Sequence, residues 1–427
     1  MKIYLICYAS AFLFARAGYH WLAGTVLMAA AVWLYWEDYR RSGNLLHLRA
    51  VFGLFWVGGQ GLSCLKLSHL QIPWEWETWM CFLVAYLGFW LAFEWLSYEF
   101  GRVDVRQKAF RNLQGMEKGL LLGVAGITEV SLIAFTAEAL ILGYVPFFTK
   151  GVPHAYSYFH ITGVHYFTVS CVLVPALSLL YFHIERGRNT QKAVTVILCT
   201  VIALVIPVLC VSRFQLIFAV LLAVLTGILT RKSLHPLVIA AGGVGMLGLY
   251  ILLTIARAHD VAYLNGIFEM KNAKTPIFIT QPYMYIANNY DNFNCLVRDL
   301  PSHTFGLRML FPIWALTGLK FVAPSLVSFP LFVTKTELTT LTLFYDAYYD
   351  FGIIGVGIFS MLLGAAAYVL MSEIKKVQNP VGYLFYAQFA AYLMLSFFTT
   401  WYSNPTTWFY LAMTTVVWVL CRRRRWQ

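Results

Sequence analysis

The sequence predicts an all-α fold: a polytopic integral membrane protein with about twelve transmembrane helices and one large extracytoplasmic loop that contains short helices. Of the 427 residues, 60% are hydrophobic and only 12% are charged, whereas soluble domains are about 45–50% apolar and about 25% charged. The apolar residues gather in stretches near the length of about 20 residues at which a helix crosses a bilayer. We expect a single membrane domain over residues 1–427, with the loop at residues 256–350.

Twelve apolar stretches account for the expected spans. No small-residue cleavage motif follows the first stretch, so we expect it to be retained as a span and not removed as a signal peptide. The stretches cover residues 3–15, 19–36, 47–65, 79–97, 119–143, 162–182, 193–211, 214–229, 236–255, 351–371, 381–400 and 407–421.

The basic residues orient the chain. With the N-terminus in the cytoplasm, 20 of the 31 Lys and Arg residues fall in cytoplasmic connections and four in short outer connections. Membrane proteins carry such an excess on the cytoplasmic side. The remaining seven lie in the 256–350 loop, which is therefore predicted to face outward, with both termini cytoplasmic. This bias also explains the net charge of +12, so the lipid bilayer is an expected partner and nucleic acid is not.

One part of the loop, Phe305–Val333, is apolar enough to suggest a thirteenth span. Counting it would place Lys375, Lys376 and the terminal arginines outside, against the charge bias. Pro312, Pro324 and Pro330 also divide it into short pieces. We therefore expect short amphipathic helices that lie on or dip into the outer leaflet.

The cysteine pattern points to no disulfide framework. Most of the eight cysteines lie inside expected spans, and only Cys295 lies deep in the loop. No C-x-x-C spacing suggests a metal site, so no metal and no other cofactor is expected.

Arg213 is the first candidate for substrate binding. It stands where one expected span ends and the next begins at the outer face. An arginine at this depth is costly to bury unless it is paired. One possibility is that the Arg213 side chain extends to the membrane–water interface or pairs with Glu138. The other is that its planar guanidinium group binds a lipid phosphate.

Arg257, Arg298 and Arg308 are the loop arginines that could join it. Arg257 begins the loop, and the other two flank His303. Several guanidinium groups facing the outer leaflet could together neutralise a diphosphate. The alternative for each is surface charge that attracts anionic lipid head groups.

Five groups are candidates for proton transfer: His303, His259, Asp291, Asp346 and Asp350. A hydroxyl is a poor nucleophile, so a positioned base accelerates its attack. His303 is the preferred base because arginines flank it, although a loop histidine can also be structural. Asp350 follows Asp346 at i, i+4 spacing, but it equally suits the N-cap of the next span.

Aromatic and amide side chains in the loop could line a sugar site. The run from Tyr283 to Asn294 alternates amides with rings, and a second aromatic run follows at residues 345–349. The first run could as well be a capped junction between loop and helix. The aromatic candidates for substrate binding are Tyr285, Tyr290, Tyr345 and Tyr349.

Two carboxylates stand in the fifth expected span. Glu129 and Glu138 are nine residues apart, which places them on opposite faces of a helix. They therefore do not form a paired carboxylate site. Glu138 could orient an arginine, and Glu129 would suit proton coupling in a transporter.

Over most of its length the chain resembles the oligosaccharide repeat-unit polymerases, also called O-antigen polymerases (Wzy). The late position of the single large outer loop agrees with this. The resemblance is carried by Leu142–Phe148, Tyr156-Ser157-Tyr158, Gly163–Tyr166, Ser212-Arg213 and Tyr345–Gly355.

The resemblance implies a bacterial glycosyltransferase of GT-C-like type in the cytoplasmic membrane. Its substrate would be an undecaprenyl-diphosphate-linked oligosaccharide, whose growing glycan passes to an incoming repeat unit without a metal. Arginines would stabilise the departing diphosphate. Arg213 would correspond to the family's membrane-edge arginine, and Arg257, Arg298 and Arg308 to its loop arginines. A chain-length regulator protein would be a further partner.

Two other functions are compatible with the same pattern. A lipid-linked oligosaccharide flippase, or another transporter, would also have many spans, although a loop of about ninety residues favours an enzyme. An O-antigen ligase would perform the same chemistry on a different acceptor, and His303 loosely matches the loop histidine of those ligases.

Overall fold

The computed structural model describes residues 1–103, 116–149, 155–184, 189–230, 248, 261–272 and 274–422. The fold of this part is all-α, with an isolated β-bridge between Ser68 and Met270. The chain forms two compact units, each assembled from separate segments. The first comprises residues 1–106, 260–373 and 392–405, and the second comprises residues 107–259, 374–391 and 406–427.

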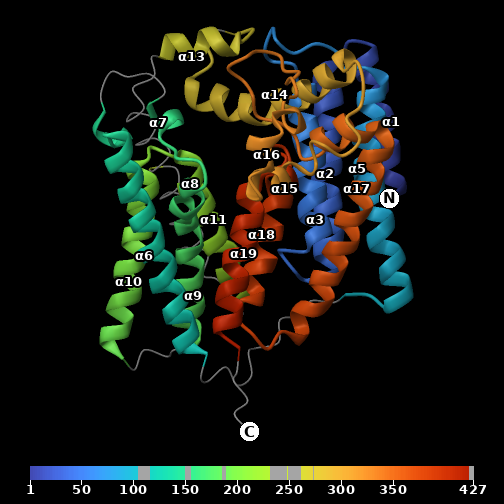
Figure 1. Ribbon diagram of the computed structural model, residues 1–427. Helices are drawn as coiled ribbons and strands as arrows, with labels where there is room; N and C mark the ends of the chain where they lie inside the picture. The colour runs from blue at the N-terminus through green and yellow to red at the C-terminus, as the bar shows by residue number, and fades with distance from the viewer. Residues whose placement is uncertain are drawn as a thin grey trace. The chain divides into compact units, whose positions relative to one another are not determined.

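The first unit contains the N-terminal helices and the long helix α17 (Figure 1). Its helices are α1 (Lys2–Arg16), α2 (His20–Ser42), α3 (Leu48–Phe52), α4 (Gly58–Cys64), α5 (Trp76–Phe100), α13 (Val261–Phe268), α14 (Ile277–Asp299), α15 (Phe311–Leu316), α16 (Leu319–Val322) and α17 (Tyr345–Glu373). A π-helical turn, Gly53–Val57, joins α3 to α4, so residues 47–65 form three consecutive pieces instead of one regular helix.

The second unit is built from the middle of the chain and its C-terminal part. The helices of this unit are α6 (Glu117–Leu142), α7 (Ala155–Tyr158), α8 (Val164–Val169), α9 (Val174–Ile184), α10 (Thr190–Leu209), α11 (Arg213–Thr230), α18 (Gly382–Met394), which continues into the first unit, and α19 (Pro405–Leu420). Asn189 caps α10 by accepting the backbone N–H of Lys192 at 3.1 Å.

Long apolar helices indicate a multi-pass membrane protein. Within the described residues, six helices are long and apolar enough to cross a bilayer. The expected stretch at 236–255 lies outside the described residues except for Gly248. The six are Trp76–Phe100, Glu117–Leu142, Val164–Ile184, Thr190–Leu209, Arg213–Thr230 and Tyr345–Glu373.

Helices α5 and α17 of the first unit pack closely because glycines line their contact. A Cβ placed on Gly364 would lie 2.2 Å from the backbone oxygen of Phe89, and one on Gly88 would lie 2.1 Å from Ser360 Oγ. Small residues at a helix contact allow the two backbones to approach closely. These contacts lie on the part of α17 that follows the non-helical backbone at Phe351 and Gly352.

The 256–350 loop contains the short helices that its prolines predict. Residues 305–333 form α15, α16 and a 3-10 turn at Pro324–Leu326, and Phe321 and Val322 on α16 are 67% and 83% exposed. The loop also contains α14, a helix of 23 residues, which is longer than the expected pieces. It runs crosswise to α5 and α17 (Figure 1), and its amide side chains are buried.

Candidate functional site

An ion pair between the loop and α17 forms the centre of the candidate site. Nε of Arg308 lies 2.6 Å from Oδ1 of Asp346, and the two side chains are 14% and 5% exposed. This is the only hydrogen bond that the Arg308 guanidinium makes to the described residues. The two terminal nitrogens of the guanidinium can therefore donate to a ligand.

Two tyrosine rings hold the same guanidinium. Its central carbon lies 4.5 Å from the ring centroid of Tyr349 and 5.7 Å from that of Tyr345, within the range of cation–π contacts. Burial lowers the pKa of Arg308, but the Asp346 carboxylate more than offsets this effect, so the pKa lies above its ordinary value. Arg308 is thus a fixed, permanently positive group.

A cavity of about 320 Å³ opens beside the ion pair. One part of its lining is polar, with Arg308, Asp346 and three residues that precede α19. The other part is apolar and comes from the loop. The lining consists of Leu307, Arg308, Phe311, Leu326, Val327, Phe329, Asp346, Thr400, Ser403, Asn404 and Pro405. The cavity therefore suits a ligand with an anionic group and an apolar part.

Asp350 shapes the turn that carries Arg308. Its carboxylate accepts the backbone N–H groups of Met309 at 2.8 Å and Arg308 at 3.2 Å, together with the hydroxyl of Thr304. Non-helical backbone follows at Phe351 and Gly352, so Asp350 does not cap a continuous helix. Its carboxylate closes the turn at residues 304–309 instead.

His303 lies beside this turn and is not part of the cavity lining. Its Nδ1 is 3.2 Å from the backbone oxygen of Tyr349, and its ring packs edge-on against Tyr348. Nε2 faces Gly352, where a Cβ would come within 3.1 Å of it. The sequence predicts His303 as the base, whereas in the structure its ring is directed toward the backbone of α17.

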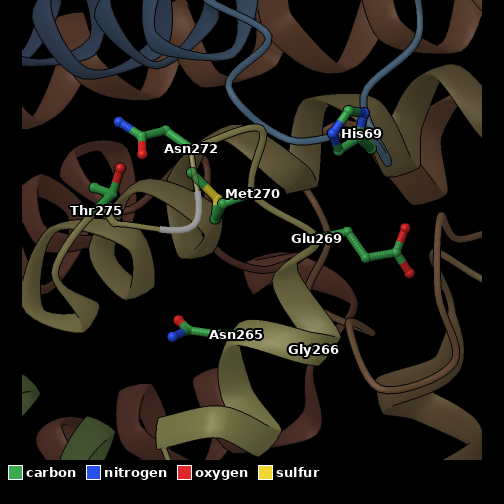
Figure 2. Close-up of a pocket in the computed structure, with 7 residues that line it drawn as sticks. All are labelled: His69, Asn265, Gly266, Glu269, Met270, Asn272 and Thr275. Carbon is green, nitrogen blue, oxygen red and sulfur yellow. The ribbon is translucent and has the colours of Figure 1, made fainter.

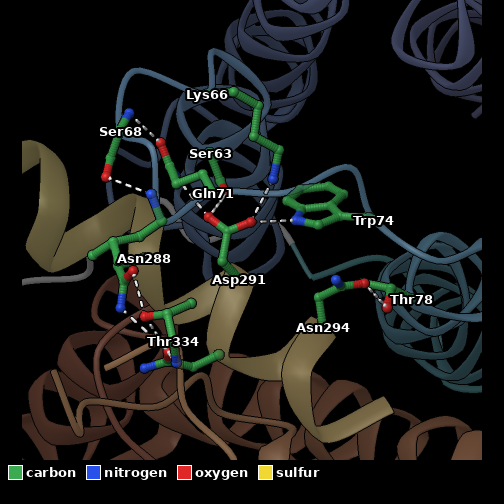
Figure 3. Close-up of polar contacts among 12 residues, drawn as sticks. Ser63, Lys66, Ser68, Gln71, Trp74, Thr78, Asn288, Asp291, Asn294 and Thr334 are labelled. Carbon is green, nitrogen blue, oxygen red and sulfur yellow. Dashed lines mark hydrogen bonds and ion pairs between the residues drawn. The ribbon is translucent and has the colours of Figure 1, made fainter. Parts of the chain in front are cut away.

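Asp291 lies in a separate, fully buried network (Figure 3). Its carboxylate pairs with Lys66 and accepts hydrogen bonds from Gln71 Nε2 at 2.6 Å, Trp74 Nε1 at 2.9 Å and Ser63 Oγ at 3.1 Å. Four donors occupy both carboxylate oxygens. This arrangement fastens the segment before α5 to α14, and it leaves little capacity for proton transfer.

The remaining loop candidates lie apart from the cavity lining. Tyr290 is fully buried, and its hydroxyl donates to the backbone oxygen of Trp56 at 2.9 Å. The Tyr285 ring contacts Phe398. Arg298 forms an exposed pair with the adjacent Asp299, with Nε and Oδ1 2.7 Å apart. Of the predicted aromatic residues, only Tyr345 and Tyr349 contact an arginine of this site.

In the second unit, Arg213 begins α11 and is 7% exposed. The nearby turn is strained, because Val211 has a φ of +53°, which is rare for a β-branched residue. Arg257 and His259 lie outside the described residues.

Glu138 of α6 is completely buried and forms a carboxylate–imidazole pair with His165 of α8. Nδ1 of His165 lies 3.1 Å from both Glu138 oxygens. The Glu138 carboxylate also accepts the hydroxyl of Thr168 at 2.8 Å and the backbone N–H of Ile161 at 2.9 Å. The sequence did not predict this pair.

A second cavity of about 330 Å³ lies in the first unit, near the β-bridge (Figure 2). Its lining mixes amide, hydroxyl, carboxylate and imidazole groups. The lining residues are His69, Asn265, Gly266, Glu269, Met270, Asn272 and Thr275. The carboxylate is already paired, since Lys335 Nζ lies 2.7 Å from Glu269 Oε1.

Sequence reasoning missed part of the cavity beside Arg308. Thr400, Ser403 and Asn404 precede the last apolar helix, and their only signal is a polar interruption between two apolar stretches. The sequence names Asp346 as a candidate for proton transfer, without a partner. Its pairing with Arg308, 38 positions earlier in the chain, depends on the tertiary fold.

Comparisons with protein-family models, with curated proteins and with solved structures find no match to this chain.

Proposed function

We propose that the protein is a bacterial polymerase of undecaprenyl-diphosphate-linked oligosaccharide repeat units. The single observation that carries this proposal is the cavity in which the Arg308–Asp346 pair faces apolar loop residues. A polyprenyl diphosphate has the same two parts, a strongly anionic group and a long apolar chain.

Arg308 binds the diphosphate in this proposal. Its terminal nitrogens have no recorded hydrogen bond to the described residues, and a guanidinium fork matches a phosphate with two parallel donors. Tyr345 and Tyr349 hold the guanidinium plane, so little side-chain freedom is lost on binding. The departing diphosphate gains negative charge as the glycosidic bond breaks, and the fixed positive charge stabilises it.

The proposed setting is the bacterial cytoplasmic membrane. About twelve spans would place both termini in the cytoplasm and the 256–350 loop on the outer side, in agreement with the distribution of basic residues. The exposed apolar residues of α16 suit contact with the outer leaflet. The lipid substrate would reach the cavity from that leaflet, and a chain-length regulator could act on the product.

The decisive test compares surface glycans in cells that lack the chain and cells that carry variants of it. Loss of a polymerase leaves single repeat units attached to the acceptor. Arg308→Ala should reproduce that pattern. Arg308→Lys should also shorten the glycan, because a point charge cannot replace a bidentate fork. Arg298→Ala serves as the matched control, since Arg298 is exposed and lies outside the cavity.

Two results would overturn the proposal. Cells lacking the chain could carry full-length polymer, or they could carry no repeat unit on the acceptor. The second pattern identifies a ligase, which joins the glycan to a different acceptor. Full-length polymer in the Arg308→Ala variant would remove the assigned role of Arg308.

A lipid-linked oligosaccharide transporter is the second candidate, and the Glu138–His165 pair favours it. Ionisable groups within membrane spans are costly and form proton relays in pumps and transporters. If transport is the function, deletion of the chain should trap repeat units on the cytoplasmic side, and Glu138→Gln should do the same. Normal outward display of single units in both strains would exclude this candidate.

A further inference from the structure

The second oxygen of Asp346 is the feature that the diphosphate site leaves unexplained. Oδ1 accepts the hydrogen bond from Arg308, whereas Oδ2 accepts none from any described residue. The side chain is 5% exposed and belongs to the cavity lining. Because Asp346 lines the cavity and Oδ2 receives no hydrogen bond from the described residues, this oxygen can accept one from a molecule bound in the cavity. Oδ2 therefore has the surroundings of a group that receives a proton from a bound molecule.

Resting on the proposed polymerase function, we propose that Asp346 is the catalytic base that activates the acceptor hydroxyl. The acceptor is the sugar hydroxyl of the incoming repeat unit. Its oxygen attacks the anomeric carbon of the growing glycan, and its proton passes to Oδ2. The bond between that carbon and the diphosphate oxygen breaks, and its electron pair leaves with the diphosphate. Each bond that forms is matched by one that breaks, and no oxidant, reductant or metal is needed.

The neighbouring Arg308 couples the two halves of this step. One guanidinium contacts the base through Nε and has its remaining nitrogens available for the leaving group. When Oδ2 takes the proton, one negative charge beside Arg308 disappears. At the same time the diphosphate gains negative charge. The same arginine can therefore shift its electrostatic stabilisation from the base to the leaving group without moving.

The other candidate bases are less suited by their contacts. The Asp350 carboxylate receives three donors from the 304–309 turn, and that of Asp291 receives four from another region. Nδ1 of His303 is directed at a backbone oxygen, and His303 is not part of the cavity lining. Among these carboxylates, Asp346 combines a place in the cavity with an available oxygen.

Asp346→Asn is the informative variant because amide and carboxylate have nearly the same shape. The asparagine oxygen can still accept the hydrogen bond from Arg308, but the side chain cannot take up a proton. Polymer formation should fall by roughly 100-fold or more, as expected for loss of a general base. Asp346→Glu keeps the carboxylate and should retain part of the activity.

Binding separates a catalytic role from a structural one. The probe is undecaprenyl diphosphate, titrated into the purified full-length protein in detergent. Asp346→Asn removes a negative charge beside Arg308, so binding should be as tight as in the unmodified chain or tighter. If Asp346 merely positioned Arg308, binding would weaken together with activity.

The outcomes are distinct. Unmodified polymer length in cells carrying Asp346→Asn overturns the assignment of the base, as does weakened binding of undecaprenyl diphosphate by that variant. If the unmodified chain does not bind the probe, or its deletion leaves surface polymer intact, the polymerase proposal itself fails. Normal binding with lost polymerisation in Asp346→Asn, and partial recovery in Asp346→Glu, supports both.

Discussion

The carboxylate of Asp350 accepts the backbone N–H of Arg308 at 3.2 Å. One helical turn earlier, Asp346 binds the side chain of the same arginine at 2.6 Å. The two carboxylates therefore have different roles toward one residue. Asp350 sets the path of the backbone, and Asp346 sets the direction of the guanidinium. This arrangement makes the cavity sensitive to changes that never touch its lining.

Asp350→Ala should therefore impair the site indirectly. The variant leaves the half-buried N–H groups of Arg308 and Met309 and the Thr304 hydroxyl without this acceptor, which costs up to about 1–3 kcal/mol of stability, the value for a fully buried unsatisfied group. Thermal unfolding of the purified protein in detergent measures this loss. We also expect weaker binding of undecaprenyl diphosphate. Unchanged unfolding temperature and unchanged binding together would show that the turn does not depend on Asp350.

Gly352→Ala should be destabilising for two separable reasons. Gly352 has a φ of +60° and a ψ of −150°, a backbone region that is essentially restricted to glycine and costs another residue about 1–3 kcal/mol. The new Cβ would also lie 3.1 Å from Nε2 of His303. The double variant Gly352→Ala with His303→Ala should recover the second part and keep the first. If His303→Ala changes nothing in the Gly352→Ala background, the imidazole contact is not a source of strain.

Asp291→Ala should reduce the amount of folded protein, in contrast to Asp346→Asn. It leaves the buried Lys66 ammonium without its ion-pair partner, and breaking such a pair costs about 3–5 kcal/mol. Replacing both members, with Asp291→Leu and Lys66→Met, should recover much of that loss. The yield of monodisperse protein in detergent is the readout. A normal yield of the Asp291→Ala variant that has lost polymerisation would instead indicate a catalytic role for Asp291.

The exposed pair of Arg298 and Asp299 should contribute little stability, with a defined pH dependence. Arg298 holds the pKa of Asp299 below its ordinary value. The ion pair therefore stabilises the folded protein at pH values above the pKa that Asp299 has in the unfolded chain. This stabilisation is lost as the pH falls through the lower pKa that Asp299 has in the folded protein. Because the side chains are 44% and 40% exposed, Arg298→Ala should change stability at pH 7 by less than about 1 kcal/mol. A larger change, or one that persists at pH 2, would contradict this.

The proposed orientation can be tested with single cysteines and a thiol reagent that cannot cross the membrane. Ser302→Cys, in the exposed segment of the 256–350 loop, should react in intact cells. Gln191→Cys, at the exposed start of α10, should react only after the membrane is opened. Each variant is compared with the unmodified chain, most of whose cysteines are buried. The reverse labelling pattern would place the loop in the cytoplasm and exclude the proposed reaction there.

Local features of the sequence account for much of the secondary structure. Apolar stretches predict the long helices, because a bilayer requires every backbone polar group to be paired within its own segment. Prolines divide residues 305–333 into short helices. The polar helix α14 was not predicted from the sequence. Its buried amide side chains are stabilised by hydrogen bonds to segments that are distant in the chain, and local sequence patterns do not reveal such contacts. Nδ2 of Asn292, for example, donates to the backbone oxygens of Leu338 and Thr340.

For the candidate site, the sequence by itself determined the residue types and their neighbourhood: arginines, carboxylates and tyrosines in a loop too polar to cross a membrane. Only the tertiary structure decided which of them meet. In the folded protein Arg308 forms an ion pair with Asp346, and Lys66 forms one with Asp291. Thr400 and Ser403 line the cavity beside Arg308. Hydropathy and helix periodicity are patterns that extend over a few helical turns, so they predict local structure and not contacts between distant segments. The partner of a buried charge depends on side chains that are distant in the chain, and the packing of the helices decides which of them it reaches.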